Sequence, residues 1–240
     1  AEYRWAIDLG GENYNLYNMF GGNATTEKSR WAYYRNRGEG HNTIIINPGL
    51  LADQPIDKTA KISEYKSASE YGYAVINMHP IYGKYTQSAQ RGVYFNKING
   101  SLLVRDEIVF NDGESNNLYW FMHTKANIEL SEDKKSAILT NGSGSRLWVG
   151  IIDSDQTFSV SDAVPLETSP NPNEWEENKA NDGTSTNPQK QNENAGVRKL
   201  VINDKNASGN WNTAVYMVLL KDGQTAPDSL PENIDISSWN

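Results

Sequence analysis

Short runs of apolar and aromatic residues alternate with short polar turns along the whole chain. Runs of four to eight such residues with period-two alternation are typical of strands, and no window shows the 3.6-residue spacing of an amphipathic helix. The runs that we expect to form strands are 3–9, 42–47, 72–79, 91–110 (two strands), 117–124, 127–130, 136–141, 146–152, 157–160, 199–204 and 212–222. This pattern predicts an all-β fold, a two-sheet antiparallel β-sandwich of about a dozen strands, with a closed barrel as the alternative.

Two runs show clearly which side chains share a face. Alternate residues of a strand point to opposite sides of the sheet. In the first run we expect one face to hold Leu118, Trp120 and Met122, and the other Tyr119, Phe121 and His123. In the second, one face holds Ala214, Tyr216, Val218 and Leu220.

The pair Asn99-Gly100 lies between the two halves of the run 91–110. Both residues tolerate positive φ, so the pair predicts a hairpin with a type I′ turn.

One segment interrupts the rhythm of strands. Residues 163–197 contain four prolines, many polar residues and a single aromatic residue, Trp175, so we expect a long irregular loop that packs on its surroundings. The polar tail after residue 227 carries Trp239 as an expected anchor. With no repeat or linker elsewhere, residues 1–240 read as one domain.

The composition narrows the possible classes of function. The chain has 240 residues, a net charge of −8 and no cysteine. The negative charge argues against general nucleic-acid binding, and the absence of cysteine excludes disulfides, thiol catalysis and cysteine-bound metals. No apolar run is long enough to span a membrane, and no signal peptide is visible.

Several familiar catalytic motifs are missing from the sequence. It contains no glycine-rich phosphate loop, no His-Glu-x-x-His, no nucleophile elbow and no EF-hand loop. Candidate functional residues must therefore be found as groups of side chains that match none of these motifs.

Asp8 and His41 are candidate metal ligands. A carboxylate and an imidazole suit zinc, but a structural site needs four ligands and a catalytic site three. His79 and His123 are possible third ligands, although each reads as a residue on an outward strand face. The alternative to a metal site is simpler for both residues. Asp8 would only hydrogen-bond the turn that follows it, and His41 would lie solvated at the edge of a strand.

The stretch 28–37 concentrates basic and aromatic residues. Guanidinium groups match carboxylate and sulfate oxygens, and aromatic faces stack on sugars. We therefore expect a surface for an acidic polysaccharide, with a solvated strand pair as the alternative; its residues are Arg30, Trp31, Tyr33, Tyr34, Arg35 and Arg37.

A glycine- and asparagine-rich loop, residues 10–23, carries Glu12, Tyr14 and Tyr17. A tyrosine can act as general acid or base when its surroundings lower its pKa. Tyr14 and Tyr34 are the candidate catalytic residues, while a loop with packed aromatic side chains is the simpler reading. Four Asn-x-Ser/Thr acceptors, which matter only if the source organism glycosylates, are Asn23, Asn99, Asn141 and Asn206.

Most of residues 4–125 resembles the C-terminal β-sandwich region of heparinase II/III-type polysaccharide lyases. The resemblance lies in "RWAIDLGGENYNL" and "YYRNRGEGHNTIIINPG", followed in the same order by "GYAVINMHPIYGKY", "AQRGVYFNK" and "LLVRDEIVF". It implies a lyase that cleaves uronic-acid polysaccharides, such as heparan sulfate, heparin or alginate, by β-elimination.

The resemblance also implies roles and missing parts. Asp8 and His41 correspond to metal-ligand positions, with zinc as the expected structural metal and the third ligand on a His-x-His-x-Asp strand upstream of residue 1. The helical toroid that carries further catalytic residues would also lie upstream. We therefore expect a C-terminal fragment, inactive alone, whose partners are its own N-terminal helical domain and an acidic polysaccharide.

Two other functions remain possible from the sequence. One is a non-catalytic carbohydrate-binding or structural sandwich, and the other is a metal-dependent hydrolase, which the small number of ligands disfavours. A bacterial-type periplasmic or secreted location is expected for the lyase.

Overall fold

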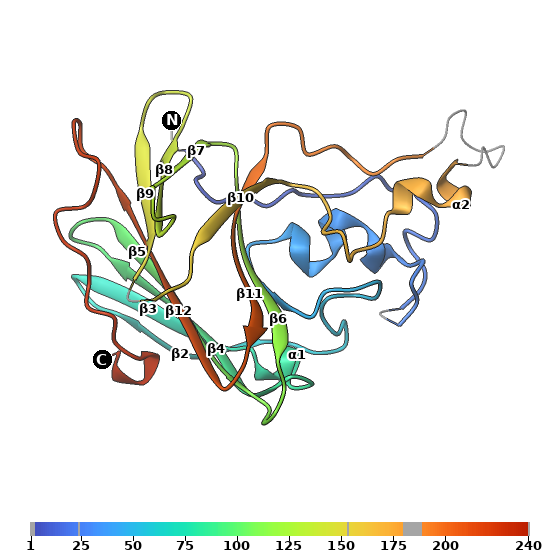
Figure 1. Ribbon diagram of the computed structural model, residues 1–240, viewed down its shortest axis with the longest axis horizontal. Coiled ribbons are helices and arrows are strands. Elements are labelled where there is room, and N and C mark those ends of the chain that lie inside the picture. Colours follow the sequence, from blue (N-terminus) through green and yellow to red (C-terminus); the bar gives the residue numbers. More distant parts are fainter. Residues whose placement is uncertain (1–2, 24, 153, 180–188, 240) are drawn as a thin grey trace.

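Twelve strands form two antiparallel sheets in the computed structural model, which describes residues 3–23, 25–152, 154–179 and 189–239 (Figure 1). The strands are β1 (Ile44–Ile46), β2 (Lys61–Ser67), β3 (Tyr71–Asn77), β4 (Thr86–Asn96), β5 (Ser101–Phe110), β6 (Asn116–Thr124), β7 (Asn127–Leu130), β8 (Ser136–Thr140), β9 (Arg146–Ile151), β10 (Phe158–Asp162), β11 (Arg198–Ala207) and β12 (Asn210–Leu219).

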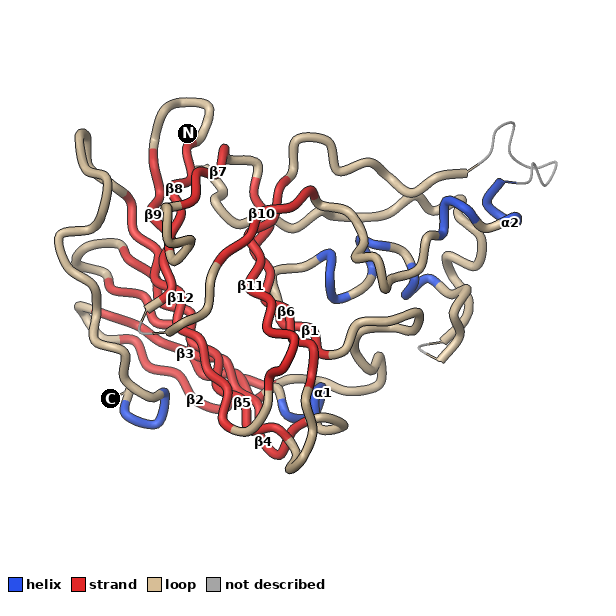
Figure 2. Tube along the Cα trace, viewed as in Figure 1, coloured by secondary structure: helices blue, strands red, loops and turns tan. Residues whose placement is uncertain are grey.

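The smaller sheet has the order β1-β6-β11-β10, and the larger β2-β3-β4-β5-β12-β9-β8-β7. Both sheets are open, with distinct edge strands, so the predicted sandwich is confirmed and the barrel is excluded. Figure 2 shows the two sheets lying against each other, with a loop-rich region on the far side of the smaller sheet.

Apolar side chains from both sheets fill this interior. β6 directs Leu118, Trp120 and Met122 into it, where they meet Ile108 of β5 and Val215 of β12. The predicted alternation of β6 is thus confirmed, because its other face lies in a separate cluster.

The outer face of each sheet is also covered. Phe121 of β6 packs outside the smaller sheet with Leu166 of the loop region. On the larger sheet, Ala214 and Tyr216 pack with Trp239 of the tail, which is 4% exposed. The expected face of β12 and the anchoring role of Trp239 are confirmed.

Residues 3–9 do not form the strand that we predicted. Their side chains alternate as expected, with Tyr3 and Trp5 packed on the core. Their backbone, however, makes a single bond to the sheet, from the Ile7 N–H to the His123 carbonyl at 3.0 Å. An extended segment without a ladder of such bonds is not a strand.

Three other expectations need correction or addition. β2 was not predicted, because its seven residues are all exposed and its two large apolar residues, Ile62 and Tyr65, do not follow a period-two alternation. The β4–β5 hairpin is confirmed, but its turn spans 97–100 and only Gly100 has positive φ, so the turn is not type I′. The stretch 28–40 forms three-residue helical turns rather than a strand pair.

The helical elements are all short. They are η1 (Arg30–Ala32), η2 (Tyr34–Asn36), η3 (Gly38–Gly40), α1 (His79–Tyr82), η4 (Pro172–Glu174), α2 (Glu176–Lys179) and η5 (Ile236–Ser238). In the part of the chain that the structure describes, no helix has the length and apolar character to cross a membrane.

The expected loop at 163–197 contains only η4 and α2 in its described parts, and residues 180–188 lie outside the described residues. Trp175 packs on Tyr33 with ring centroids 5.6 Å apart. The prediction that this loop packs on its surroundings is therefore confirmed for its described parts.

Candidate functional site

Asp8 and His41 come together at the edge of the smaller sheet. The Asp8 Oδ2 atom lies 2.6 Å from the His41 Nδ1 atom, although 33 residues separate them. The turn after Asp8 is held by the Gly10 N–H, which donates to Asp8 Oδ1 at 2.8 Å. His41 follows η3 immediately and precedes β1. Both side chains remain open to solvent, so a ligand has access to the pair.

Asp8 is ionised at neutral pH. Partial burial opposes its ionisation, but the Gly10 N–H and His41 outweigh this and hold the pKa of the carboxyl below its ordinary value. The pair therefore presents a carboxylate beside an imidazole.

This donor pair fits zinc in kind but supplies only two ligands. Bonds of about 2.0–2.1 Å in a tetrahedral site place two donor atoms roughly 3.3 Å apart. Asp8 Oδ2 and His41 Nδ1 would have to separate for both to bind one ion. In the other arrangement Asp8 orients His41, which binds through Nε2, as carboxylates often do for zinc-bound histidines.

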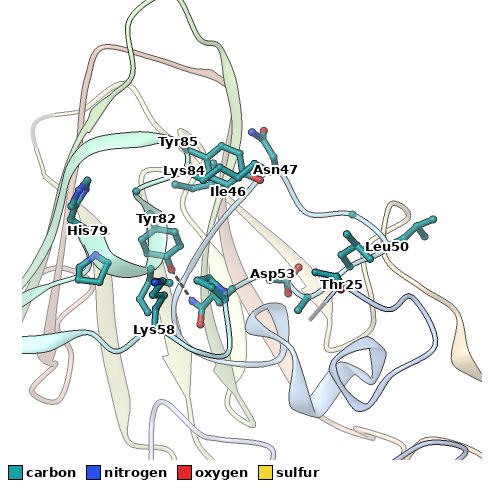
Figure 3. Close-up of a pocket in the computed structure, with 18 residues that line it drawn as sticks. Thr25, Ile46, Asn47, Leu50, Asp53, Lys58, His79, Tyr82, Lys84 and Tyr85 are labelled. Carbon is teal, nitrogen blue, oxygen red and sulfur yellow. Dashed lines mark hydrogen bonds between the residues drawn. The ribbon is translucent and has the colours of Figure 1, made fainter. Parts of the chain in front are cut away.

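Neither of the other histidines joins the pair. Among the described residues no group of three or more potential metal-binding side chains occurs. His123 lies on the outer face of β6 with Phe121, as predicted, but it is fully buried there, and Tyr34 and Asn42 take its ring nitrogens. His79 lies on α1 beside a separate hollow of about 850 Å³, where Gln54 donates to the Tyr82 hydroxyl (Figure 3).

A small basic hollow adjoins Asp8. It has a volume of about 250 Å³, and three cationic side chains line it: Arg4, Arg35 and Lys125. Arg4 and Lys125 are exposed, and Glu193 is a second acidic group in the lining besides Asp8. The hollow thus concentrates positive charge within a protein whose net charge is −8.

Arg35 is fixed by its hydrogen bonds. Its Nη1 atom donates to the Gly11 carbonyl and its Nη2 atom to the Glu193 carbonyl, both at 2.9 Å. Its Nε atom donates to Asn194 Oδ1 at 2.9 Å. Arg35 therefore joins the loop after Asp8 to the end of the 163–197 loop.

Beneath the pair lies a buried polar chain. Lys199 Nζ donates to the Tyr34 hydroxyl at 3.2 Å and to the Val164 carbonyl at 2.9 Å. Tyr34 Oη and His123 Nε2 are 2.9 Å apart, and His123 Nδ1 lies 3.3 Å from Asn42 Oδ1. If Lys199 donates to Tyr34, Tyr34 to His123 and His123 to the Asn42 side-chain oxygen, each group has a hydrogen-bond partner.

Burial sets the protonation of this chain. It raises the pKa of Tyr34 far above its ordinary value. Burial, together with the nearby charge of Lys199, lowers the pKa of His123 to about 4, and burial lowers that of Lys199 to about 8. Tyr34 and His123 are therefore neutral at neutral pH. Their burial keeps both side chains from direct contact with a ligand at the surface.

Arg37 belongs to a buried ionic cluster. Its Nη2 atom lies 2.5 Å from Asp53 Oδ1, and it also donates to the Gly49 carbonyl at 2.8 Å. Glu39 Oε2 accepts from the Leu166 N–H at 3.1 Å. Burial raises the pKa of Glu39. The Gly-Glu-Gly turn thus ties two loops together inside the protein.

The remaining candidates are scattered. Tyr33 is fully buried, while Arg30 and Trp31 are partly exposed and form a cation–π contact, with Arg30 Cζ 5.0 Å from the ring centroid. Tyr14 is 64% exposed and packs edge-on against Phe20. The arginine–aromatic stretch therefore does not form one exposed surface, since three of its six members are buried.

Sequence reasoning missed the cationic residues Arg4, Lys125 and Lys199. Alternation along 3–9 places Arg4 on the exposed side, which was a usable signal. Lys125 follows β6 directly, and Lys199 lies in β11 opposite His123. No local pattern relates Lys125 to Lys199, because only the pairing of β6 with β11 brings their strands together.

The geometry defines a class of protein: an open β-sandwich that carries a carboxylate–imidazole pair beside a basic hollow. Over residues 2–209 the chain matches the family described as Heparinase II/III-like, C-terminal, and it belongs to that family. The predicted resemblance is confirmed. No curated protein matches the chain in sequence.

Solved structures share the fold. The heparan sulfate lyase HepC from Pedobacter heparinus is 16% identical, with a TM-score of 0.59, and the match covers 93% of this chain and 29% of that one. A heparinase III is 15% identical, with a TM-score of 0.58 and the same two coverages. The chain thus spans less than a third of the length of these relatives.

Proposed function

We propose that this chain is the β-sandwich part of a polysaccharide lyase that cleaves uronic-acid-containing chains by β-elimination. The observation that carries the proposal is the Asp8–His41 pair beside the basic hollow, in a chain of the Heparinase II/III-like, C-terminal family. The two similar structures, named a heparan sulfate lyase and a heparinase III, support the substrate class.

β-Elimination at a uronate has three requirements. The carboxylate charge must be neutralised so that the C5 proton becomes acidic, a base must remove that proton, and an acid must protonate the leaving oxygen. Arg4 and Lys125 are exposed cations suited to the first requirement. Among the described residues near the hollow, Tyr34 and His123 are buried, so we assign the base and acid to another part of the protein.

We further propose that Asp8 and His41 hold a structural zinc ion with a third ligand from outside this chain. A bound divalent cation would fix the start of β1 against the segment 3–9. The other part of the protein, a helical domain, would close the cleft over the basic hollow, and a periplasmic or secreted location follows from a polymeric substrate.

The test compares the full-length protein with residues 1–240 on heparan sulfate and on alginate, following the ultraviolet absorbance of unsaturated uronate. We expect full-length protein to generate the signal on one of the two polymers and residues 1–240 to generate none. Full-length protein that binds a polymer without any rise in absorbance would instead support a non-catalytic carbohydrate-binding module.

A further inference from the structure

We propose that the outer face of the eight-stranded sheet carries a second binding site, which accepts an uncharged sugar residue. The site is a hollow of about 460 Å³ between the β4–β5 turn and the C-terminal tail. This volume lies within the range of about 300–1,000 Å³ typical of small-ligand sites. The proposal does not depend on the lyase function, because this hollow and the basic hollow share no residue.

The tail that forms one wall is firmly attached to the sheet. Arg105 of β5, 3% exposed, bonds Asn233 and lies 2.5 Å from Asp235 Oδ1. The Ile236 N–H donates to Glu107 Oε1 at 2.9 Å. The hollow is therefore formed before a ligand arrives, which lowers the entropic cost of binding.

An aromatic wall supplies the surface for a sugar ring. Tyr94 is partly exposed, and its ring is stacked on Tyr71 at a centroid distance of 5.4 Å and contacts Trp239 edge-on at 5.6 Å. These contacts fix the ring of Tyr94. The C–H groups of a pyranose carry partial positive charge and pack favourably on the negative face of an aromatic ring.

Polar groups at the hairpin turn complement the aromatic wall. Asn96 Oδ1 accepts from the Ile98 N–H at 2.9 Å, and Asn99 Oδ1 from the Ser101 N–H at 3.0 Å. Each amide group is thereby oriented, while its NH₂ group has no partner in the described part of the chain. The Ser101 hydroxyl, on a residue 3% exposed, is likewise free of partners there. These groups match the hydroxyls of a sugar.

The charges of the lining decide which sugar fits. None of the residues lining this hollow is a lysine, arginine or histidine, and Glu232 is the one carboxylate among them. A uronate or a sulfated sugar would meet repulsion without a compensating cation. The hollow thus differs from the basic hollow beside Asp8 and favours an uncharged ring.

The experiment is an NMR titration of residues 1–240 with cellotriose, N-acetylated chitotriose and mannotriose at millimolar concentrations. We expect at least one trisaccharide to shift the amides of 96–101 and the indole N–H of Trp239. A heparin-derived tetrasaccharide should leave these signals unmoved. No shift with any of the three neutral sugars, or an equal shift with the heparin fragment, would overturn the proposal.

Two variants locate the binding. Tyr94→Ala should weaken affinity at least about tenfold, and Asn99→Asp, which keeps the turn's acceptor but loses the amide donor, should weaken it severalfold. Tyr65→Ala, at an exposed aromatic on β2 of the same sheet, should bind as the unaltered protein does. Unchanged affinity in both Tyr94→Ala and Asn99→Asp would place the sugar elsewhere and refute the site.

Discussion

Lys199 shows how a single buried residue links stability to pH. Burial lowers its pKa to about 8, against an ordinary value of 10.5. Between these values the unfolded chain binds more protons than the folded one, so stability rises with pH, by at most about 1.4 kcal/mol per pH unit. Tyr34, with a raised pKa, acts in the opposite direction above pH 10.

We predict that Lys199→Met flattens the increase in unfolding free energy between pH 8 and 9.5, as measured by urea titration. Lys61→Met, at an exposed position of β2, is the matched control and should retain the increase. Parallel curves for the unaltered protein and Lys199→Met would show that Lys199 keeps its ordinary titration in the folded state.

The second prediction at this scale concerns Asp8 and His41. In the full-length protein we expect His41→Ala and Asp8→Ala each to lower zinc affinity by more than about tenfold, because each removes a ligand or its orienting partner. Elemental analysis after dialysis against a chelator measures the bound metal. His79→Ala should retain zinc, since His79 lies beside a separate hollow. Equal zinc content in all the variants would exclude the proposed site.

At the scale of elements, Gly92 in β4 is required by the tail. A Cβ atom at this position would lie 2.5 Å from Cη2 of Trp239 and 3.0 Å from Cγ1 of Ile236. We predict that Gly92→Ala displaces the tail and destabilises the protein by about 1–3 kcal/mol. Limited proteolysis should then cleave after residue 227 faster than in the unaltered protein.

Gly72 in the neighbouring strand β3 provides the control. A Cβ atom there would lie 3.4 Å from the Lys66 carbonyl, an ordinary contact. Gly72→Ala should leave both stability and tail cleavage close to the original values. Similar effects of the two substitutions would mean that loss of backbone freedom, and not the Trp239 contact, controls the tail.

Most elements could be predicted from the sequence because burial imposes a pattern on them. β6 and β12 alternate as their two environments require. The exceptions have physical reasons. β2 forms by backbone pairing with β3 while its side chains stay exposed, so no apolar pattern records it. Residues 3–9 have the alternation of a strand but lack its ladder.

The candidate site was less predictable than the fold. The chemistry of Asp8 and His41 made both candidate ligands, but their role as a pair rested on a family resemblance, since nothing local relates a turn residue to a residue 33 positions away. For Arg37 the sequence was misleading. The basic and aromatic stretch around it suggests a ligand-binding surface, but Arg37 is buried and Asp53 neutralises its charge. Residue type indicates which chemistry is available, whereas burial decides where it is used.

At the scale of the whole molecule, the basic hollow should matter for an acidic polymer. We predict that Arg4→Met and Lys125→Met each lower kcat/KM of the full-length protein roughly tenfold, about 1.4 kcal/mol, through loss of charge neutralisation. The effect should shrink at high salt, because exposed charges are screened.

Lys58→Met is the control for this prediction. Lys58 lines the separate hollow of Figure 3, so its loss changes the net charge equally without touching the basic hollow. If all three variants lose activity to the same extent, the net charge of the protein, rather than the hollow, attracts the polymer.

The position of Arg35 has a consequence for how the protein would respond to its ligand. All three of its nitrogen atoms already donate to the protein, and two of these bonds hold the end of the 163–197 loop. A guanidinium has five N–H donors, so one N–H on each Nη atom remains for an anion while all three bonds to the protein persist. An anion bound there would use an Arg35 side chain that Glu193 and Asn194 hold in place, so ligand binding and attachment of the loop would each strengthen the other by the same free energy.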